Sequence, residues 1–364
     1  MEQISLIIQK RSRVSPLLSM FVLTGVSIPA IAQETPAPSS EERSPWLLAP
    51  VFSNSPKLGT ALGALGGYLH YFDEKSRPSI FAVTGQYTST DSIIAGTFAK
   101  TSFHEDGQRL SVGLMAGNVK NDYDDYLGTG VPLKSNVELR SLISRYLYRI
   151  SGNWFIGAQG LYQNFAIGGE TTFDQEVLDI LGVRPYKSGG LGLVAYHDSR
   201  DSDTMPTRGW VLSVNNMAYR EEFGGEDEFD VYRVDFRYFH EHGKGNVFAM
   251  RQLNHFTANA PTQVKAPVQL RGYKLGQYNG DYMAEIEGEE RLRLGEKWTA
   301  TIFAGIACTY GGDESCSEST NIYPAWGAGI QYVLKPKEGI VMNLEYAQGE
   351  GSNYGVYLKM GYAY

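Results

Sequence analysis

Charged residues recur at every second position in the segment 281–294 of this 364-residue chain. Successive side chains of a β-strand point to opposite faces, so this spacing gathers the charges on one face of a strand. The charged face consists of Glu285, Glu287, Glu289, Arg291 and Arg293, and the other of Ala284, Ile286, Gly288, Leu292 and Leu294, with Glu290 as the exception. We expect the charged face to line a wet interior.

A lone arginine lies in the long connection 259–280, immediately before this strand. Glycines follow it and permit sharp folding of the chain. A guanidinium group can fork across a carboxylate through two hydrogen bonds, so an inward-folded loop could pair with the strand's carboxylates. From spacing alone, a surface loop whose arginine meets solvent is equally open. The residues concerned are Leu270, Arg271, Gly272 and Tyr273 in the loop, and Glu285, Glu287 and Glu289 as candidate acidic partners.

Short stretches of alternating polarity, separated by turn signals, fill the chain from residue 45 onward, and no long helical period interrupts them. This pattern predicts only β structure there. We place sixteen strands near 46–54, 58–72, 79–89, 92–103, 107–118, 134–149, 153–166, 187–199, 208–220, 229–242, 246–258, 281–294, 297–310, 323–335, 338–349 and 353–364.

Aromatic residues bracket the apolar face of several of these strands. In 297–310 the face runs from Trp298 to Tyr310, and in 353–364 from Tyr354 to Tyr364. Aromatics at both ends of an apolar band are typical of the two interfaces of a membrane. Strands span a bilayer only as a closed ring, and each charge at mid-depth on the lipid face costs about 2–4 kcal/mol. We therefore predict an antiparallel transmembrane β-barrel of about sixteen strands, with charged faces inward.

The connections differ in length between the two ends of this predicted barrel. Those at 119–133, 167–186, 259–280 and 311–322 are long, whereas those at 150–152, 243–245, 295–296 and 336–337 are very short. Bacterial outer-membrane barrels have long extracellular loops and short periplasmic turns. The long connections are therefore expected outside the cell.

The N-terminal residues predict export. Basic residues precede an apolar stretch that ends in Ala30-Ile31-Ala32, which indicates a signal peptide over 1–32. The Pro-, Ser- and Glu-rich segment 33–44 is expected to be a disordered periplasmic lead-in, and 45–364 the barrel domain. Removal of 1–32 makes the formal charge more negative than −8, which argues against nucleic acid as a partner.

The two cysteines, Cys308 and Cys316, close a small loop, and in an exported protein they predict one local disulfide.

Asp198, Asp201 and Asp203 could belong to a calcium-like loop, but Asp, Ser, Pro and Gly in this segment favour a capped turn. The histidines are scattered and no catalytic motif is present. We expect no enzymatic activity, no cofactor and no metal.

Two motifs resemble a known family. LRGY followed by an E-x-R strand (Glu289, Arg291) is similar to the loop signature of the BamA/TamA superfamily of outer-membrane assembly factors and two-partner secretion transporters, also called bacterial surface antigens. The segment YHDSRDSDTMPTRGW resembles that family's strand-turn-strand signature, and PVFSNSPKLGTALGALGGYLHYF (50–72) resembles the first hairpin of its barrels without N-terminal domains. The turn residues concerned are Asp198, Arg200, Asp201, Pro206 and Gly209.

The resemblance implies a sixteen-stranded barrel in which Arg271 reaches into the lumen and pairs with acidic wall residues. Two departures stand out. The family often has an aspartate on the strand after the E-x-R strand, where this chain reads TIFAGIACTYGG, and the segment 33–44 is too short to hold a substrate-receiving POTRA domain. The terminal aromatics Tyr362 and Tyr364 resemble the recognition signal of outer-membrane barrels, although Lys359 stands where that signal usually has glycine.

The expected function is protein insertion into, or translocation across, the outer membrane of a Gram-negative type of cell. The expected partners are outer-membrane lipids, periplasmic accessory proteins, and unfolded or secreted protein substrates. The alternative, motivated by the charged interior, is a passive channel or transporter for small solutes or lipids.

Overall fold

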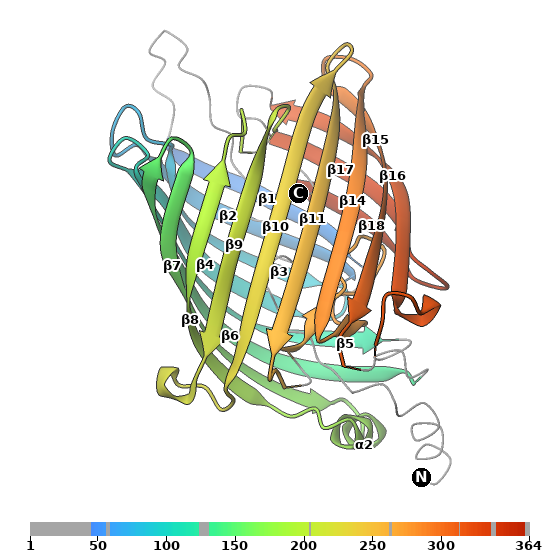
Figure 1. The fold of residues 1–364 in the computed structure, drawn as a ribbon. Coiled ribbons are helices and arrows are strands. Elements are labelled where there is room, and N and C mark those ends of the chain that lie inside the picture. The colour runs from blue at the N-terminus through green and yellow to red at the C-terminus, as the bar shows by residue number, and fades with distance from the viewer. Residues whose placement is uncertain are drawn as a thin grey trace.

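The computed structural model describes residues 45–55, 59–123, 131–203, 205–261, 264–312, 314–335 and 340–360. Sixteen strands form one antiparallel sheet in chain order, as predicted (Figure 1). The strands are β1 (Trp46–Ser55), β2 (Gly59–His70), β3 (Ser79–Thr88), β4 (Ile93–Phe103), β5 (Gln108–Tyr123), β6 (Leu133–Ser151), β7 (Trp154–Gly169), β8 (Tyr186–Asp198), β9 (Gly209–Tyr219), β10 (Phe229–His242), β11 (Asn246–Ala258), β14 (Tyr282–Arg293), β15 (Trp298–Tyr310), β16 (Ile322–Lys335), β17 (Ile340–Gln348) and β18 (Tyr354–Met360).

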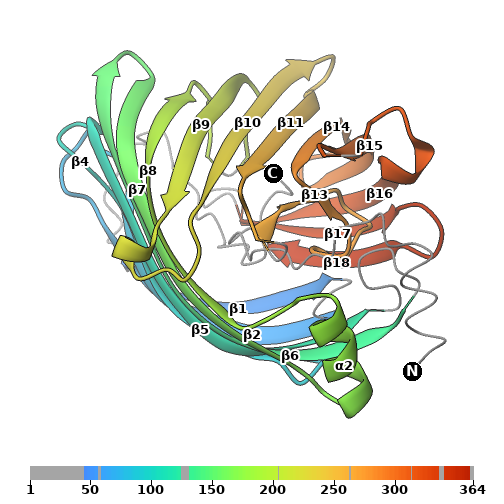
Figure 2. The ribbon, with the colours of Figure 1, turned by 60° about the horizontal axis from the view of Figure 1, so that its bottom comes forward.

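The sheet curls round until β18 lies beside β1, which gives the molecule the form of a barrel (Figure 2). Every strand pairs with the next along the chain, apart from β11, which pairs with β14 across a small separate ladder of β12 (Ala266–Pro267) and β13 (Asn279–Gly280). Short antiparallel connections favour this meander, because a tight turn returns the chain beside the strand it has just left. The long connection before β14 is thereby free to leave the wall.

The two faces of the strands differ as their alternation predicts. On β15, Trp298, Ile302 and Ile306 are exposed on the outside of the barrel. On the neighbouring β14, Glu285 and Glu289 are buried, so the charged face points inward. The outside at these strands is therefore apolar, and the inner face of β14 is charged.

The barrel has a long-loop end and a short-turn end. Strands β5, β7, β9, β11 and β15 end at the long-loop end, and β4, β6, β8, β10 and β14 end at the short-turn end. The predicted signal peptide (1–32), the lead-in (33–44), and Tyr362 and Tyr364 lie outside the described residues.

The all-β fold is confirmed, and the described residues also include a few short helical segments in the loops. A helix, α2 (Thr172–Ile180), lies in the connection between β7 and β8, and two single 3₁₀ turns, η2 (Glu221–Phe223) and η4 (Ser319–Asn321), lie in other loops. Thr171 and Asp174 form a capping box that satisfies free N–H groups at the start of α2. The helix is too short for its period to stand out, but this local signal is readable in the sequence. Among the described residues, no helix is long and apolar enough to cross a membrane.

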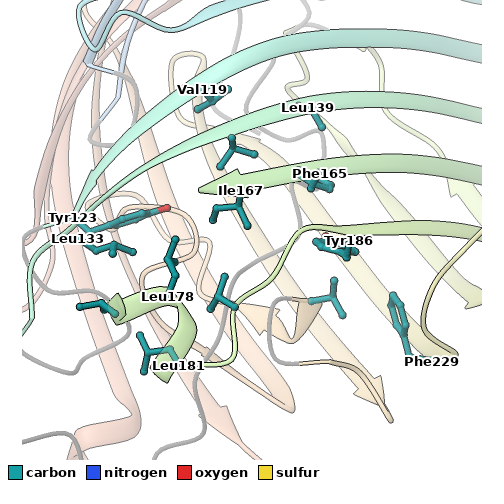
Figure 3. Close-up of a cluster of buried hydrophobic side chains, with 14 of the residues drawn as sticks. Val119, Tyr123, Leu133, Leu139, Phe165, Ile167, Leu178, Leu181, Tyr186 and Phe229 are labelled. Carbon is teal, nitrogen blue, oxygen red and sulfur yellow. The ribbon is translucent and has the colours of Figure 1, made fainter. Parts of the chain in front are cut away.

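Helix α2 covers an apolar cluster at the long-loop end, on the inner face of strands that are longer than predicted (Figure 3). β5 continues to Tyr123 and β7 to Gly169, beyond the predicted ends at 118 and 166. The cluster includes Val119, Tyr123, Leu133, Leu139, Phe165, Ile167, Leu178, Leu181, Tyr186 and Phe229. Because the inner face of these extensions is apolar, it must be covered, and α2 covers it.

Candidate functional site in the barrel lumen

The connection 259–281 turns into the barrel and packs against the wall. Val268, Leu270 and Tyr273 are buried and contact an apolar patch that includes Ala307 and Tyr323 on β15 and β16. Arg271, between them, is only 8% exposed. The surface-loop alternative therefore does not hold, and the loop lies in the lumen, as the resemblance implies. We call the described residues of this connection, 259–261 and 264–281, the lumenal loop.

Arg271 is held by carboxylates from two strands. Its Nη2 lies 2.6 Å and its Nε 3.1 Å from Oε1 of Glu287, so the guanidinium group donates two hydrogen bonds to this carboxylate. Its Nη1 lies 2.8 Å from Oε2 of Glu289 and 3.3 Å from Oε2 of Glu345 on β17. Its guanidinium carbon lies 3.3 Å from the ring centroid of Phe303, which adds a cation–π contact. A buried cation needs such dense compensation, because its desolvation is costly.

Two of the three candidate acidic partners contact Arg271, and the third does not. Glu285 instead accepts a hydrogen bond from the backbone N–H of Gln269 at 3.0 Å and lies 3.9 Å from Nη1 of Arg251. The three glutamates share a strand face, but the loop passes them at different heights. Glu285 therefore fastens the loop backbone, whereas Glu287 and Glu289 bind the loop cation.

The sequence pattern did not identify Glu345 or Phe303 as partners of Arg271. A signal for both exists in the inward glycines of β16. A Cβ at Gly327 would lie 2.3 Å from the Phe303 ring, and a Cβ at Gly329 would lie 2.8 Å from Cγ of Glu345. Small residues there leave the space in which the Phe303 ring and the Glu345 side chain approach Arg271. The strand that lacks the family's aspartate thus carries Phe303, and the third carboxylate comes from β17.

The lumenal loop is also fastened to the last hairpin of the barrel. The N–H of Gly272 donates to the hydroxyl of Tyr357 on β18 at 2.8 Å, and the N–H of Glu350 donates to the hydroxyl of Tyr273 at 2.9 Å. Gly272 has a φ of +100°, and a Cβ there would lie 2.8 Å from the N of Gly349. Only glycine fits both the conformation and the close approach.

The loop reaches the opposite wall as well. Nζ of Lys274 donates to the backbone carbonyl of Asp122 near the end of β5 at 3.0 Å. The lumenal loop thus contacts β5 as well as the last hairpin of the barrel.

A second insertion enters from the short-turn end, where the β8–β9 turn (199–208) carries the D-x-R-D and P-T-R-G residues. Pro206 is buried, and its carbonyl lies 3.4 Å from Nη1 of Arg291 on β14. Arg291 in turn pairs with Glu289 at 2.7 Å, the same carboxylate that binds Arg271. Turn and lumenal loop are therefore connected through two side chains of the E-x-R strand.

The aspartates around this turn face cations. Asp198 receives Nε of Arg200 at 2.9 Å, and Arg77, just before β3, pairs with both Asp198 and Asp203. Burial raises the pKa of Asp203, but Lys100, Arg77 and Arg200 outweigh it and hold that pKa well below its usual range. The turn is thus tied by ion pairs to strands several places away in the sheet.

The capped-turn interpretation agrees with the geometry of Asp201. Its carboxylate accepts hydrogen bonds from the N–H of Thr207 at 2.9 Å and of Arg208 at 3.2 Å. Gly209 has a φ of +97°, and a Cβ there would lie 2.3 Å from the carbonyl oxygen of Ser199. Within the described part of the chain, no cluster of His, Cys, Asp and Glu side chains suitable for a metal ion is found.

The disulfide prediction is confirmed. Cys308 and Cys316 are bonded, with their Cα atoms 5.6 Å apart. The bond joins the end of β15 to the loop 311–321 at the long-loop end.

Comparison with solved structures shows that the fold is a known one. The chain superimposes on BamA from Haemophilus ducreyi lacking POTRA domains 1–3 with a TM-score of 0.59 and 11% identity, over 88% of this chain and 71% of that one. CdiB from Acinetobacter baumannii gives 0.59 and 11%, over 87% and 59%, and CdiB from Escherichia coli gives 0.59 and 11%, over 89% and 63%. The chain has the fold of these barrels.

The likeness is one of fold, because the identity is low. The chain spans about three fifths of the length of the two CdiB chains. No family model matches the sequence, and no curated protein matches it.

Proposed function

We propose that this chain is an outer-membrane barrel that takes part in inserting proteins into the membrane or moving them across it. The observation that carries the proposal is the fastening of the lumenal loop: Arg271 binds the E-x-R strand and Glu345, while Gly272 binds Tyr357 on the last strand. The fold shared with BamA and CdiB supports it. The loop thereby joins β14 to β17 and β18, and β18 lies beside β1. We call this joining segment a latch.

The proposed orientation puts the short-turn end in the periplasm. Isoleucine and tryptophan side chains cover the outside of the barrel, a surface that suits hydrocarbon rather than water. Substrate segments, with or without separate periplasmic proteins that deliver them, would arrive at the turn 199–208. There they meet the contacts that lead through Arg291 to Arg271.

The proposed cycle opens the barrel between β1 and β18. Separation of β18 from β1 moves Tyr357. The hydrogen bond from Gly272 is then lost, and the loop is released from the last hairpin. Ion pairs to Glu287 and Glu289 keep the loop on β14 meanwhile. The latch would thus release the last hairpin while it stays bound to β14, and this lets β1 and β18 come together again.

A passive channel is the alternative, and the charged wall is the observation that favours it. The lumenal loop and the β8–β9 turn both occupy the interior, however, which argues against a wide open path. Steady conductance in a planar bilayer would support the channel. A closed or flickering pore supports the latched barrel.

Gene deletion tests the proposed function. We expect lower levels of outer-membrane proteins, or loss of a secreted protein, in the deletion strain, with recovery on expression of the parent chain. Arg271→Ala should not restore them, whereas Arg184→Ala should, because Arg184 lies exposed in a loop and pairs only with Asp227 in the part of the chain described. Unchanged outer-membrane and secreted proteomes in the deletion strain would contradict the proposal.

A further inference from the structure

A second charged group lies on the wall formed by β10 and β11, at the start of the lumenal loop. Asp235 is its centre and receives two guanidinium forks. Arg237 donates from Nε and Nη2 at 3.0 Å each, and Arg251 donates from Nη2 at 3.0 Å and from Nε at 3.4 Å. Both oxygens of the carboxylate are thereby occupied.

Arg233, on the same face of β10, is left poorly compensated. Its Nη2 lies 3.9 Å from Asp235, beyond hydrogen-bonding distance, and its recorded hydrogen bond is a long one of 3.4 Å to the neutral amide oxygen of Gln269. A guanidinium group has five N–H donors. Most of those on Arg233 therefore have no acceptor among the described residues.

Two further buried groups beside Arg233 lack partners. His255 is the register partner of Arg233 on β11 and is 2% exposed, and neither of its ring nitrogens has a hydrogen-bond partner in the described structure. The amide nitrogen of Gln269, whose oxygen contacts Arg233, is likewise buried and unpartnered there. Native proteins rarely leave buried donors unsatisfied. Gln269 and His255 thus both adjoin Arg233, and their unpartnered donors indicate an acceptor that enters from outside the chain.

The side chains at this wall carry the net positive charge that an anionic acceptor requires. The guanidinium groups of Arg233, Arg237 and Arg251 face the carboxylates of Asp235 and Glu285, so positive charge is in excess. Arg145 on β6 adds to it, because its recorded hydrogen bonds go to the neutral side chain of Gln159. That glutamine also binds Asn215, the register partner of Arg233.

We propose that Arg233, His255 and Gln269 form a binding site for an oxyanion, either a phosphate or a carboxylate group. The guanidinium of Arg233 supplies a fork of two donors, His255 a ring N–H, and Gln269 its amide N–H₂. A cation is excluded by the surplus of arginines, and an apolar group would leave the donors unpaired. The bound anion ties the lumenal loop to β10 and β11, because Gln269 belongs to the loop, Arg233 to β10 and His255 to β11. The site is independent of the proposed function in assembly.

Phosphate binding to the purified full chain in detergent tests the site. Inorganic phosphate replaces chloride at constant ionic strength, and binding is followed by ³¹P line broadening and by the thermal unfolding midpoint. We expect saturable broadening and a raised midpoint for the parent, with an affinity at least about tenfold weaker in Arg233→Gln. That factor corresponds to the loss of one charge-assisted interaction. Arg184→Gln removes a cation from an exposed loop and should bind phosphate like the parent.

Further arms separate the possible sources of the anion. Acetate in place of phosphate tells a planar carboxylate from a tetrahedral group. Short-chain phosphatidic acid below its micelle concentration tells a lipid headgroup from a free anion, since a headgroup site would bind it more tightly than phosphate. Should Arg233→Gln fail to fold by heat-modifiable gel mobility, Gln269→Leu decides in the same assay. Absence of saturation in the parent, or equal saturation in the parent and the folded site variant, overturns the proposal.

Discussion

The barrel is filled in two different ways at different levels. At the long-loop end, α2 and the extended β5, β6 and β7 bury aliphatic and aromatic side chains against one another. Deeper in the lumen, Arg271, Arg291 and the β8–β9 turn are held by ion pairs and hydrogen bonds. Apolar packing is non-directional and tolerates small shifts, whereas a buried ion pair depends on each partner staying in place. The first filling suits a permanent cover, and the second suits the release that we propose for the lumenal loop.

Removal of Arg271 should be the largest single disturbance. Arg271→Ala leaves the carboxylates of Glu287, Glu289 and Glu345 without their shared cation, and loss of one partner of a buried ion pair costs about 4 kcal/mol. We expect a lower temperature for the heat-modifiable gel shift and faster protease cleavage within residues 259–281. The control is Arg184→Ala, which should match the parent. An Arg271→Ala chain with unchanged gel shift and cleavage would show that the ion pairs do not hold the loop.

A cavity in the apolar cluster should rank second. Leu178→Ala removes a fully buried side chain of α2, and such truncations cost about 3 kcal/mol. We expect protease cleavage in the connection 170–185 to become faster while cleavage of the lumenal loop stays at the parent rate. Ile180→Ala, on the exposed side of the same helix, is the matched control. The two fillings would not be independent if the Leu178 variant also released the lumenal loop.

Loss of the Asp203 charge should have a smaller effect that depends on pH. Asp203→Asn removes the negative charge that faces Arg77 and Lys100, and a hydrogen bond to a charged group is worth about 2 kcal/mol. The pKa of Asp203 is lowered in the folded chain, so its stabilisation is present above the unfolded pKa and is lost as the pH falls through the folded one.

The expected measurement is unfolding by denaturant between neutral pH and strongly acidic pH. The parent should lose stability towards acid more steeply than Asp203→Asn, and the difference between them should shrink as the pH falls. An equal difference at every pH would mean that the asparagine acts through packing rather than through charge.

The capping box of α2 should contribute least. Thr171→Ala removes the side-chain acceptor for the N–H of Asp174, which costs about 1 kcal/mol. We expect slightly faster amide exchange in the first turn of α2 and unchanged exchange in the lumenal loop. Thr171→Ser, which keeps the acceptor, should behave like the parent. Equal exchange in the alanine and serine variants would remove the cap from the account of this helix.

The strands and their faces were predictable because they depend on local alternation. Ile286 and Glu287 are neighbours, and their chemistry alone predicts that one faces out and the other in. The long connection before β14 was readable as a loop, but spacing left open whether it folds inward, and only the family resemblance implied that it does. Helix α2 was missed because its few turns do not establish a period, although Thr171 and Asp174 have the spacing of a capping box.

The partners in the lumen were only partly predictable. Glu287 and Glu289 are close to Arg271 in the chain, so parity pointed to them, but it also pointed equally to Glu285. Glu345 lies on β17, three strands after β14 along the chain, and nothing local connects it to Arg271. The same holds for Pro206 and Arg291, and for Arg77 and Asp203, which come together only across the barrel.

The sequence by itself determined which residues are strands, which face of each strand is charged, and where the chain leaves the wall. These properties follow from the two-residue period of a strand and from the conformational needs of its turns. Only the tertiary structure decided which carboxylates hold Arg271, that Phe303 lies against its guanidinium group, and that His255 and Gln269 both lie beside Arg233. Those contacts depend on how the curled sheet brings distant strands to the same depth, and that depth is set by the register of the whole barrel.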